Sequence, residues 1–138
     1  MGRRRVILLD TYVLVWVDEG SQRVGAKSRR LIDDALHEDA LGLSAISFWE
    51  VAELVHKGRV QLKLDLADWR RELLEYGLEE IPVTGSIGIQ VSGLENFHGD
   101  PADRLIIATA LERRATLVTA DERMLGWYGD VPRQDARN

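Results

Sequence analysis

Four acidic residues mark places where predicted strands end or predicted helices begin. Each one follows or opens a short apolar run in the sequence: Asp10, Glu50, Asp103 and Asp121. Carboxylate oxygens are the ligands that Mg²⁺ and Mn²⁺ prefer in proteins. If these side chains meet at one edge of a sheet, they form a metal site. The chemistry that such a site favours is the hydrolysis of a phosphodiester bond.

Helix capping is the alternative explanation for most of these acids. Asp10 and Asp121 each precede a predicted helix, where an aspartate side chain accepts hydrogen bonds from free backbone N–H groups. Asp100, directly before Pro101, explains the start of another helix in the same way. Asp103 has no such explanation, because it lies in the first turn of that helix, ahead of its apolar face. We therefore expect Asp10, Asp103 and Asp121 to be the firm ligands of the metal site.

Glu50 has two competing explanations. Together with Ser47 it matches a capping box, in which a hydroxyl and a carboxylate bond reciprocally to backbone N–H groups of the first helical turn. A carboxylate in that turn also reaches the end of the sheet. Two carboxylates ~5 Å apart repel each other by ~3 kcal/mol at an effective dielectric constant of ~20. Several of them together require a cation or raised pKa values. We expect Glu50 to alternate between the cap and the metal.

Two residues of other types lie close to these acids in the sequence. Arg104 follows Asp103 and is expected either to contact a phosphate or to pair with an acid. His98 is interpreted as a structural residue that forms hydrogen bonds within a loop. The chain has three histidines and no cysteine, and their positions do not match the spacing of a zinc site.

The elements that must position the acids alternate between strands and helices. Fully apolar, β-branched runs predict buried strands at 6–9, 40–45, 79–83 and 116–119. Apolar residues at helical spacing predict helices at 11–17, 21–38, 47–56, 66–76, 84–94 and 101–114, with a short one from 122. This order requires a parallel sheet with right-handed crossovers. In such a sheet ligands bind beyond the carboxyl ends of the strands, which brings acids that are distant in sequence together.

Composition and charge set wider limits. Residues 1–138 are too few for much more than one domain. The absence of cysteine excludes a disulfide framework and a thiolate metal site. The apolar run near the N-terminus is interrupted by Asp10 and is too short to span a membrane, so that we expect a cytoplasmic protein. The net charge of −5 argues at first against a nucleic-acid binder. Local pairs of arginine and lysine weaken that argument, and net charge decides little.

Four segments of the sequence resemble the PIN domain, and within it the VapC-type toxins of bacterial toxin–antitoxin pairs. The resemblance runs from about residue 6 to residue 125, and its segments are LLDTY (8–12), SAISFWEVAELVHKGRVQL (44–62), FHGDPADRLIIATAL (97–111) and TLVTADERML (116–125). The two longer segments are the specific ones, because a short run such as LVTAD occurs in many chains. Nearly the whole chain is covered.

The resemblance implies roles for particular residues. The acidic quartet of the family corresponds to Asp10, Glu50, Asp103 and Asp121. By the same resemblance, three residues are auxiliary. Asp100 is an additional acid, Thr119 supports a ligand, and Thr11 lies next to the first acid in the sequence. One position departs from the pattern: related chains usually carry histidine or a small polar residue where this sequence has Tyr12. Any role tied to that position is therefore not carried over.

The resemblance also implies a fold and an activity. The family has a three-layer α/β/α sandwich around a parallel sheet, depends on Mg²⁺ or Mn²⁺, and cleaves RNA internally. Its substrates are commonly structured RNAs such as transfer or ribosomal RNA. It further implies a homodimer, inhibition by a VapB-type antitoxin that covers the acidic groove, and no membrane partner.

Two other functions stay open on the residues alone. A different Mg²⁺-dependent phosphoryl hydrolase would use a similar sheet edge. A dehalogenase-like phosphatase needs a second aspartate where this chain has Tyr12, and a receiver domain needs a lysine after a late strand, which is absent near Thr119. The second alternative is a catalytically weak PIN-like module that binds RNA or a protein. The complete acidic quartet argues against that module, whereas Tyr12 leaves room for it.

Overall fold

A parallel β-sheet forms the centre of the computed structural model, which describes residues 5–94, 97 and 99–138. Within these residues the sheet has five strands in the order β3-β2-β1-β4-β5, and every neighbouring pair is parallel. The strands are β1 (Ile7–Leu9), β2 (Leu41–Ser44), β3 (Glu79–Ile81), β4 (Thr116–Thr119) and β5 (Arg133–Asp135). The prediction of a parallel sheet is confirmed.

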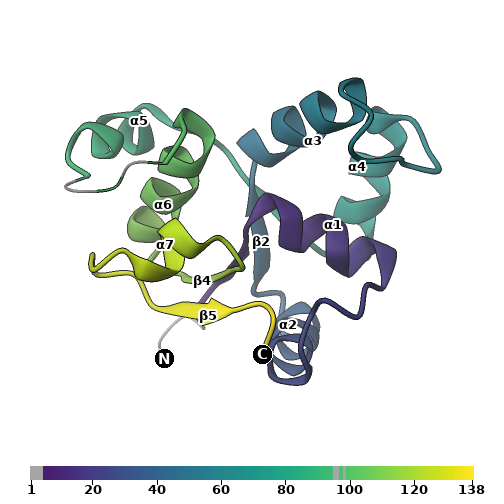
Figure 1. Ribbon diagram of the computed structural model, residues 1–138, viewed down its shortest axis with the longest axis horizontal. Helices are drawn as coiled ribbons and strands as arrows, with labels where there is room; N and C mark the ends of the chain where they lie inside the picture. The colour runs from purple at the N-terminus through teal and green to yellow at the C-terminus, as the bar shows by residue number, and fades with distance from the viewer. Residues whose placement is uncertain (1–4, 95–96, 98) are drawn as a thin grey trace.

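Helices connect the strands and cover both faces of the sheet (Figure 1). They are α1 (Thr11–Glu19), α2 (Ala26–His37), α3 (Ile46–His56), α4 (Leu66–Tyr76), α5 (Gly85–Ser92), α6 (Pro101–Arg113) and α7 (Glu122–Gly126). In Figure 1, α5, α6 and α7 lie on one side of the molecule, and α1, α3 and α4 lie on the other. Among the residues that the structure describes, no helix has the length and apolar character needed to cross a bilayer.

Two apolar cores, one on each face, make this a three-layer α/β/α sandwich. Successive residues of β1 alternate between them, because side chains of a strand point to opposite faces. Ile7 and Leu9 pack into the core that includes α1, α2 and α4, whereas Leu8 packs into the core beneath α6 and α7. In β4, Val118 and Leu117 divide in the same manner. The predicted layer arrangement is therefore confirmed.

The register of the central strands determines which residues meet at the carboxyl edge. Leu9 of β1 is aligned with Leu43 of β2 and with Val118 of β4. The next residue of β1 is Asp10, which thereby comes level with Thr119 of β4. The backbone N–H of Asp10 also donates to the carbonyl of Val118 at 3.0 Å. The end of β1 thus projects the first acid directly over the centre of the sheet edge.

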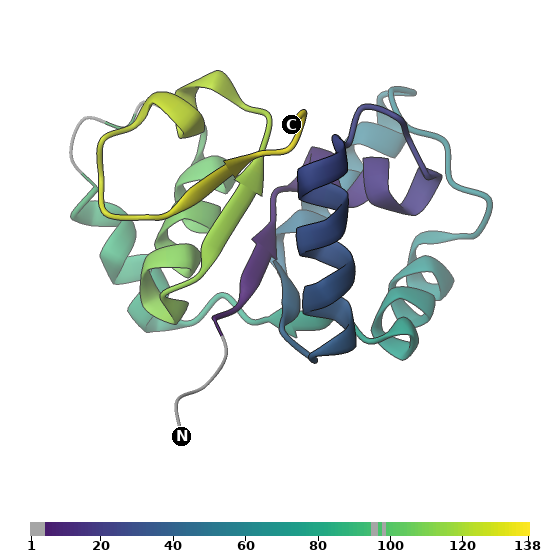
Figure 2. The ribbon, with the colours of Figure 1, turned by 90° about the horizontal axis from the view of Figure 1, so that it is seen from below.

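Strand β5 is absent from the sequence-based prediction. It extends the sheet beside β4, as Figure 2 shows, and pairs with it from Arg133 to Asp135. This segment is polar throughout, so that no hydrophobic pattern marks it as a strand. Its position depends on backbone pairing and on Arg133, whose guanidinium donates to the carbonyls of Met124 and Trp127. Such an edge strand is specified by tertiary contacts.

The helices predicted over 21–38 and 84–94 are shorter in the structure. The helix expected over 21–38 begins only at Ala26, because Ser21 ends the turn after α1 by donating its N–H to the carbonyl of Trp16. The helix expected over 84–94 is confined to Gly85–Ser92, with the hydroxyl of Thr84 as its N-cap. His98, expected to be a structural residue, lies outside the described residues.

Candidate active site

One cleft at the carboxyl edge of the sheet brings the predicted acids together. It has a volume of about 260 Å³, and five carboxylates line it: Asp10, Glu50, Asp100, Asp103 and Asp121. The remaining lining residues are Thr11, Tyr12, Trp16, Ala120 and Arg123. The acids come from four separate parts of the chain, and the parallel sheet brings them to one place.

Asp10 acts both as a helix cap and as part of the cleft. Its side chain accepts the N–H of Thr11 at 2.8 Å, as expected for the N-cap of α1. Its other oxygen accepts the hydroxyl of Thr119 at 2.7 Å. Both oxygens are therefore held in position, and the residue is almost fully buried. The two explanations that the sequence allows for Asp10 are compatible with each other.

The capping box predicted for Ser47 and Glu50 is wrong. Helix α3 follows Ala45, and no side chain caps it. Ser47 lies inside the first turn, fully buried, with its hydroxyl 2.9 Å from that of Thr11. The Thr11 hydroxyl also hydrogen-bonds Glu50. A hydroxyl carries one proton and an ionised carboxylate only accepts. Thr11 therefore donates to Glu50, and Ser47 donates to Thr11.

The start of α6 supplies two acids to the cleft. Asp100 is the N-cap and accepts the backbone N–H of Asp103 at 2.8 Å, with Pro101 as the next residue. This cap is as predicted. The tightest group of acids consists of Glu50, Asp100 and Asp103, which offer oxygens within 4.8 Å of one another. Asp100, expected to be auxiliary, is thus a member of this group, whereas Asp10 and Asp121 line the same cleft outside it.

Asp121 combines capping with an ion pair. One oxygen accepts the backbone N–H groups of Arg123 and Met124 at 2.8 and 3.2 Å, and so caps α7. The guanidinium of Arg123 lies 3.6 Å from Asp121 and 3.5 Å from Asp103. Sequence reasoning missed Arg123, and its only signal is the position two residues after an acid. The arginine places positive charge between two carboxylates of the cleft.

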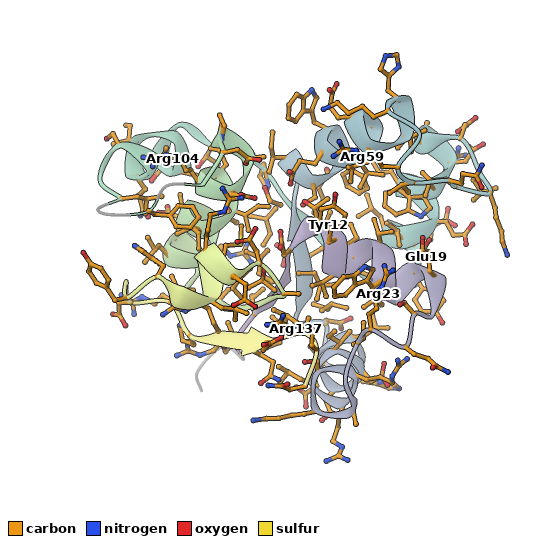
Figure 3. The ribbon with its side chains drawn as sticks, in the orientation of Figure 1. Tyr12, Glu19, Arg23, Arg59, Arg104 and Arg137 are labelled. Carbon is orange, nitrogen blue, oxygen red and sulfur yellow. The ribbon has the colours of Figure 1, made fainter. Side chains whose placement is uncertain are left out.

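Arg104 connects α6 to α5 and does not line the cleft. Its guanidinium donates to the carbonyls of Phe97 and Val91 at 2.8 and 2.9 Å, and so ties α6 to the end of α5 (Figure 3). Gly99 lets the same loop approach α6 closely. A Cβ at that position would lie 2.5 Å from the ring of Phe97 and 2.9 Å from the Cβ of Asp103. These contacts hold the start of α6 in place.

Burial and mutual repulsion perturb the acids strongly. Burial raises the pKa of Asp103 to about 7, and the negative charges of Asp100, Asp10, Asp121 and Glu50 contribute in the same direction. Burial also raises the pKa of Asp10 to about 6, although the hydrogen bonds from Thr119 and Thr11 oppose this shift. The pKa of Glu50 is raised, again chiefly by burial. A cluster with these properties binds either protons or a cation.

The metal-free protein is expected to lose stability as the pH rises from about 5 to about 8. Asp10 and Asp103 have pKa values in the folded state, about 6 and about 7, above their ordinary value. The folded state therefore holds protons that the unfolded chain releases, and the stability present at low pH is lost as the pH rises through these values. Glu80 and Asp135 have lowered pKa values and titrate below this range.

Urea unfolding in the presence of a chelator, followed by circular dichroism at several pH values, measures this effect. Adding Mg²⁺ should restore stability near pH 8 and have little influence near pH 5, because only ionised carboxylates bind the cation. A free energy of unfolding that increases steadily over this range in chelator would contradict the prediction.

Comparisons with known proteins agree with this geometry. The sequence model of the PIN domain matches residues 7–126. The chain is 37% identical over 119 residues to Ribonuclease VapC22 of Mycobacterium tuberculosis. The aligned residues cover 86% of this chain and 88% of that protein. A solved structure of VapBC2 from Rickettsia felis bound to a DNA fragment from its promoter has a TM-score of 0.66 at 16% identity, covering 94% of this chain and 97% of that one.

A second solved structure, DNA-bound VapBC from Salmonella typhimurium, has a TM-score of 0.68 at 15% identity and covers 96% of this chain and 98% of its own. At such low identities these two structures bear on the fold alone. The match to the sequence model over residues 7–126 shows that the chain belongs to the PIN domain family. Within the family it is a VapC-type ribonuclease toxin homologue, as the similarity to VapC22 shows.

Proposed function

We propose that this VapC-type chain is an endoribonuclease toxin that depends on Mg²⁺ or Mn²⁺ and cleaves structured RNA of the transfer or ribosomal class. The observation that carries the proposal is the convergence of five carboxylates in one cleft. Burial, together with repulsion from the other four acids, raises the pKa of Asp103 to about 7. A cation bound among these carboxylates would neutralise their charges and remove the repulsion.

The donor set fits a hard divalent cation. The cleft offers carboxylate oxygens, and its described lining residues include neither histidine nor cysteine, a combination that suits Mg²⁺ or Mn²⁺. The residues that would hold the ion are Asp10, Asp103 and Asp121, with Glu50 as a ligand directly or through water and Asp100 as an additional donor. The chemistry that a bound ion supplies is the activation of water and the neutralisation of charge on the phosphate.

The chain's own residues would orient the reactants. Glu50 is held at one oxygen by Thr11, so that its other oxygen is free to orient the attacking water and accept its proton. Water would form a bond to phosphorus while the bond to the leaving ribose oxygen breaks, and that oxygen would take up a proton from solvent. The guanidinium of Arg123, released once Asp103 and Asp121 are neutralised, would bind a phosphate oxygen of the RNA backbone.

The same family membership supports a proposal about the toxin's partners and setting. We propose that residues 1–138 act as one PIN domain, form a homodimer in the cytoplasm, and are inhibited by a VapB-type antitoxin. The matched structures from Rickettsia felis and Salmonella typhimurium are themselves VapBC assemblies. The exposed ring of Trp49 on α3 offers apolar surface for an antitoxin segment.

Incubation of the purified protein with transfer and ribosomal RNA tests the proposal. We expect cleavage at a few sites when Mg²⁺ or Mn²⁺ is present, and none when a chelator removes the cation. Mapping the new RNA ends identifies the substrate. Hydrolysis of phosphomonoesters without RNA cleavage would favour the other class of phosphoryl hydrolase. Binding of RNA with no hydrolysis of either substrate would favour the non-catalytic module.

A further inference from the structure

Two aromatic side chains of α1 form one wall of the acidic cleft. Tyr12 and Trp16 are four residues apart, so that they share a face of the helix and lie about 6 Å apart along its axis. Both line the cleft together with the carboxylates. Tyr12 is 47% exposed although it is next to the almost fully buried Thr11. An aromatic ring exposed at this position lies beside the acids without contributing to either core.

The positively charged side chain of Arg23 extends this wall. The guanidinium of Arg23 lies 5.7 Å from the centre of the Trp16 ring. Arg23 is exposed, and no side chain within the described part of the chain forms an ion pair or a hydrogen bond with its guanidinium. Figure 3 labels Tyr12 near the start of α1 and Arg23 alongside the same helix, away from its N-terminal end. The five donors of this guanidinium are thus available to a ligand.

We propose that Tyr12 and Trp16 form a stacking platform for an unpaired nucleobase next to the scissile phosphodiester, and that Arg23 binds the following backbone phosphate. The inference rests on the proposed ribonuclease function and names the part of the RNA that this site recognises. The substrate would be a single-stranded segment, such as a loop of a folded RNA, because a base in a duplex has both faces covered by its neighbours.

The combination of groups favours nucleic acid over a peptide. Base stacking on aromatic rings tolerates any base, and a neighbouring arginine that stacks on an aromatic ring binds the backbone phosphate. Arg123, in contrast, lies against Asp103 and Asp121, so that the phosphate it would bind is the one at the acids. Arg23 stacks on Trp16 and is therefore placed for a phosphate further along the strand. The acids, the rings and Arg23 together form a track for a single strand.

Binding of short oligoribonucleotides tests the platform. The probes are a fluorescent ten-nucleotide oligouridylate, an abasic ribose-phosphate chain of the same length, and the same length of duplex RNA. They are titrated in Mg²⁺ against the non-cleaving Asp103→Asn protein, with anisotropy as the readout. Adding Tyr12→Leu should weaken binding of the oligouridylate by roughly 5- to 150-fold, and should leave the abasic and duplex probes unaffected. Tyr12→Phe should retain the affinity.

Controls separate the platform from the enzyme and from other occupants. Tyr76→Leu makes the same change on an exposed ring of α4 and should have no effect. In the cleaving protein, Tyr12→Leu should raise KM for a loop-containing RNA. If Tyr12→Leu binds each probe as tightly as its parent does, the platform is overturned, even if RNA cleavage persists. The platform is also overturned if Tyr12→Leu weakens binding of the antitoxin and of no RNA probe. Base-dependent binding by the Asp103→Asn protein, with no RNA cleavage by the protein that retains Asp103, would instead overturn the ribonuclease function.

Discussion

Replacement of Asp103 by asparagine is expected to abolish RNA cleavage, with a loss of about 1000-fold or more, and to stabilise the metal-free protein near pH 8. The carboxylate is buried among four other acids, and its ionisation is opposed by that burial and by their charges. Asparagine has nearly the same shape without the charge. The variant therefore removes repulsion from the folded state while it removes a proposed ligand.

Two measurements test this pair of opposite effects. Thermal unfolding in chelator near pH 8 should show a midpoint raised by roughly 4 °C, or ~1 kcal/mol for a chain of this length. RNA cleavage in Mn²⁺ should be absent. Asp34→Asn changes an exposed aspartate of α2 outside the cleft, and should alter neither quantity. Retained metal-dependent cleavage in Asp103→Asn would exclude the residue from the reaction. A lowered midpoint would show that the acids do not repel in the folded state.

Replacement of Thr11 by valine is expected to weaken metal binding by about 10- to 100-fold, the usual cost of losing a residue that orients a ligand. The Thr11 hydroxyl links Ser47 to Glu50 across α1 and α3. Valine has the same shape and cannot donate, so that Glu50 loses the bond that holds it toward the cleft. Calorimetric titration with Mn²⁺ measures the affinity, and RNA cleavage should fall in parallel.

Matched variants distinguish orientation of Glu50 from general damage to the fold. Thr11→Ser keeps the hydroxyl and should retain most of the metal affinity. Thr109→Val makes the same substitution at another fully buried threonine, whose hydroxyl bonds the carbonyl of Leu105 within α6. This control should affect stability and leave metal affinity unchanged. If Thr11→Val binds Mn²⁺ as tightly as the parent, the hydrogen bond to Glu50 has no role in binding the ion.

Local patterns were sufficient for much of the fold. The apolar runs that end at Asp10 and precede Asp121 are strands because a parallel sheet buries both of its faces. The aspartate before Pro101 starts α6 as predicted. Strand β5 was missed because its residues are polar, and its pairing with β4 depends on backbone hydrogen bonds. No periodicity in the sequence reports such pairing.

The candidate site divides in a similar way. The acids were predictable because their positions at strand ends and helix starts bring them to one edge. The orientation of the side chains was not. Ser47 was expected to cap α3, yet it lies within the first turn against Thr11. Arg104 was expected near the acids, yet it bonds the carbonyls of Phe97 and Val91. Each of these outcomes depends on which neighbour is within hydrogen-bonding distance.

The parallel sheet and the gathering of Asp10, Glu50, Asp103 and Asp121 at its carboxyl edge are predictable from hydrophobic periodicity and from local capping and turn signals. The three-layer order is predictable from the resemblance to the PIN domain. Only the tertiary structure brought Asp100 within 4.8 Å of Glu50 and Asp103. It also aligned the exposed ring of Tyr12 with the acids. Distances between side chains on different elements depend on strand register and helix packing, which no single segment encodes.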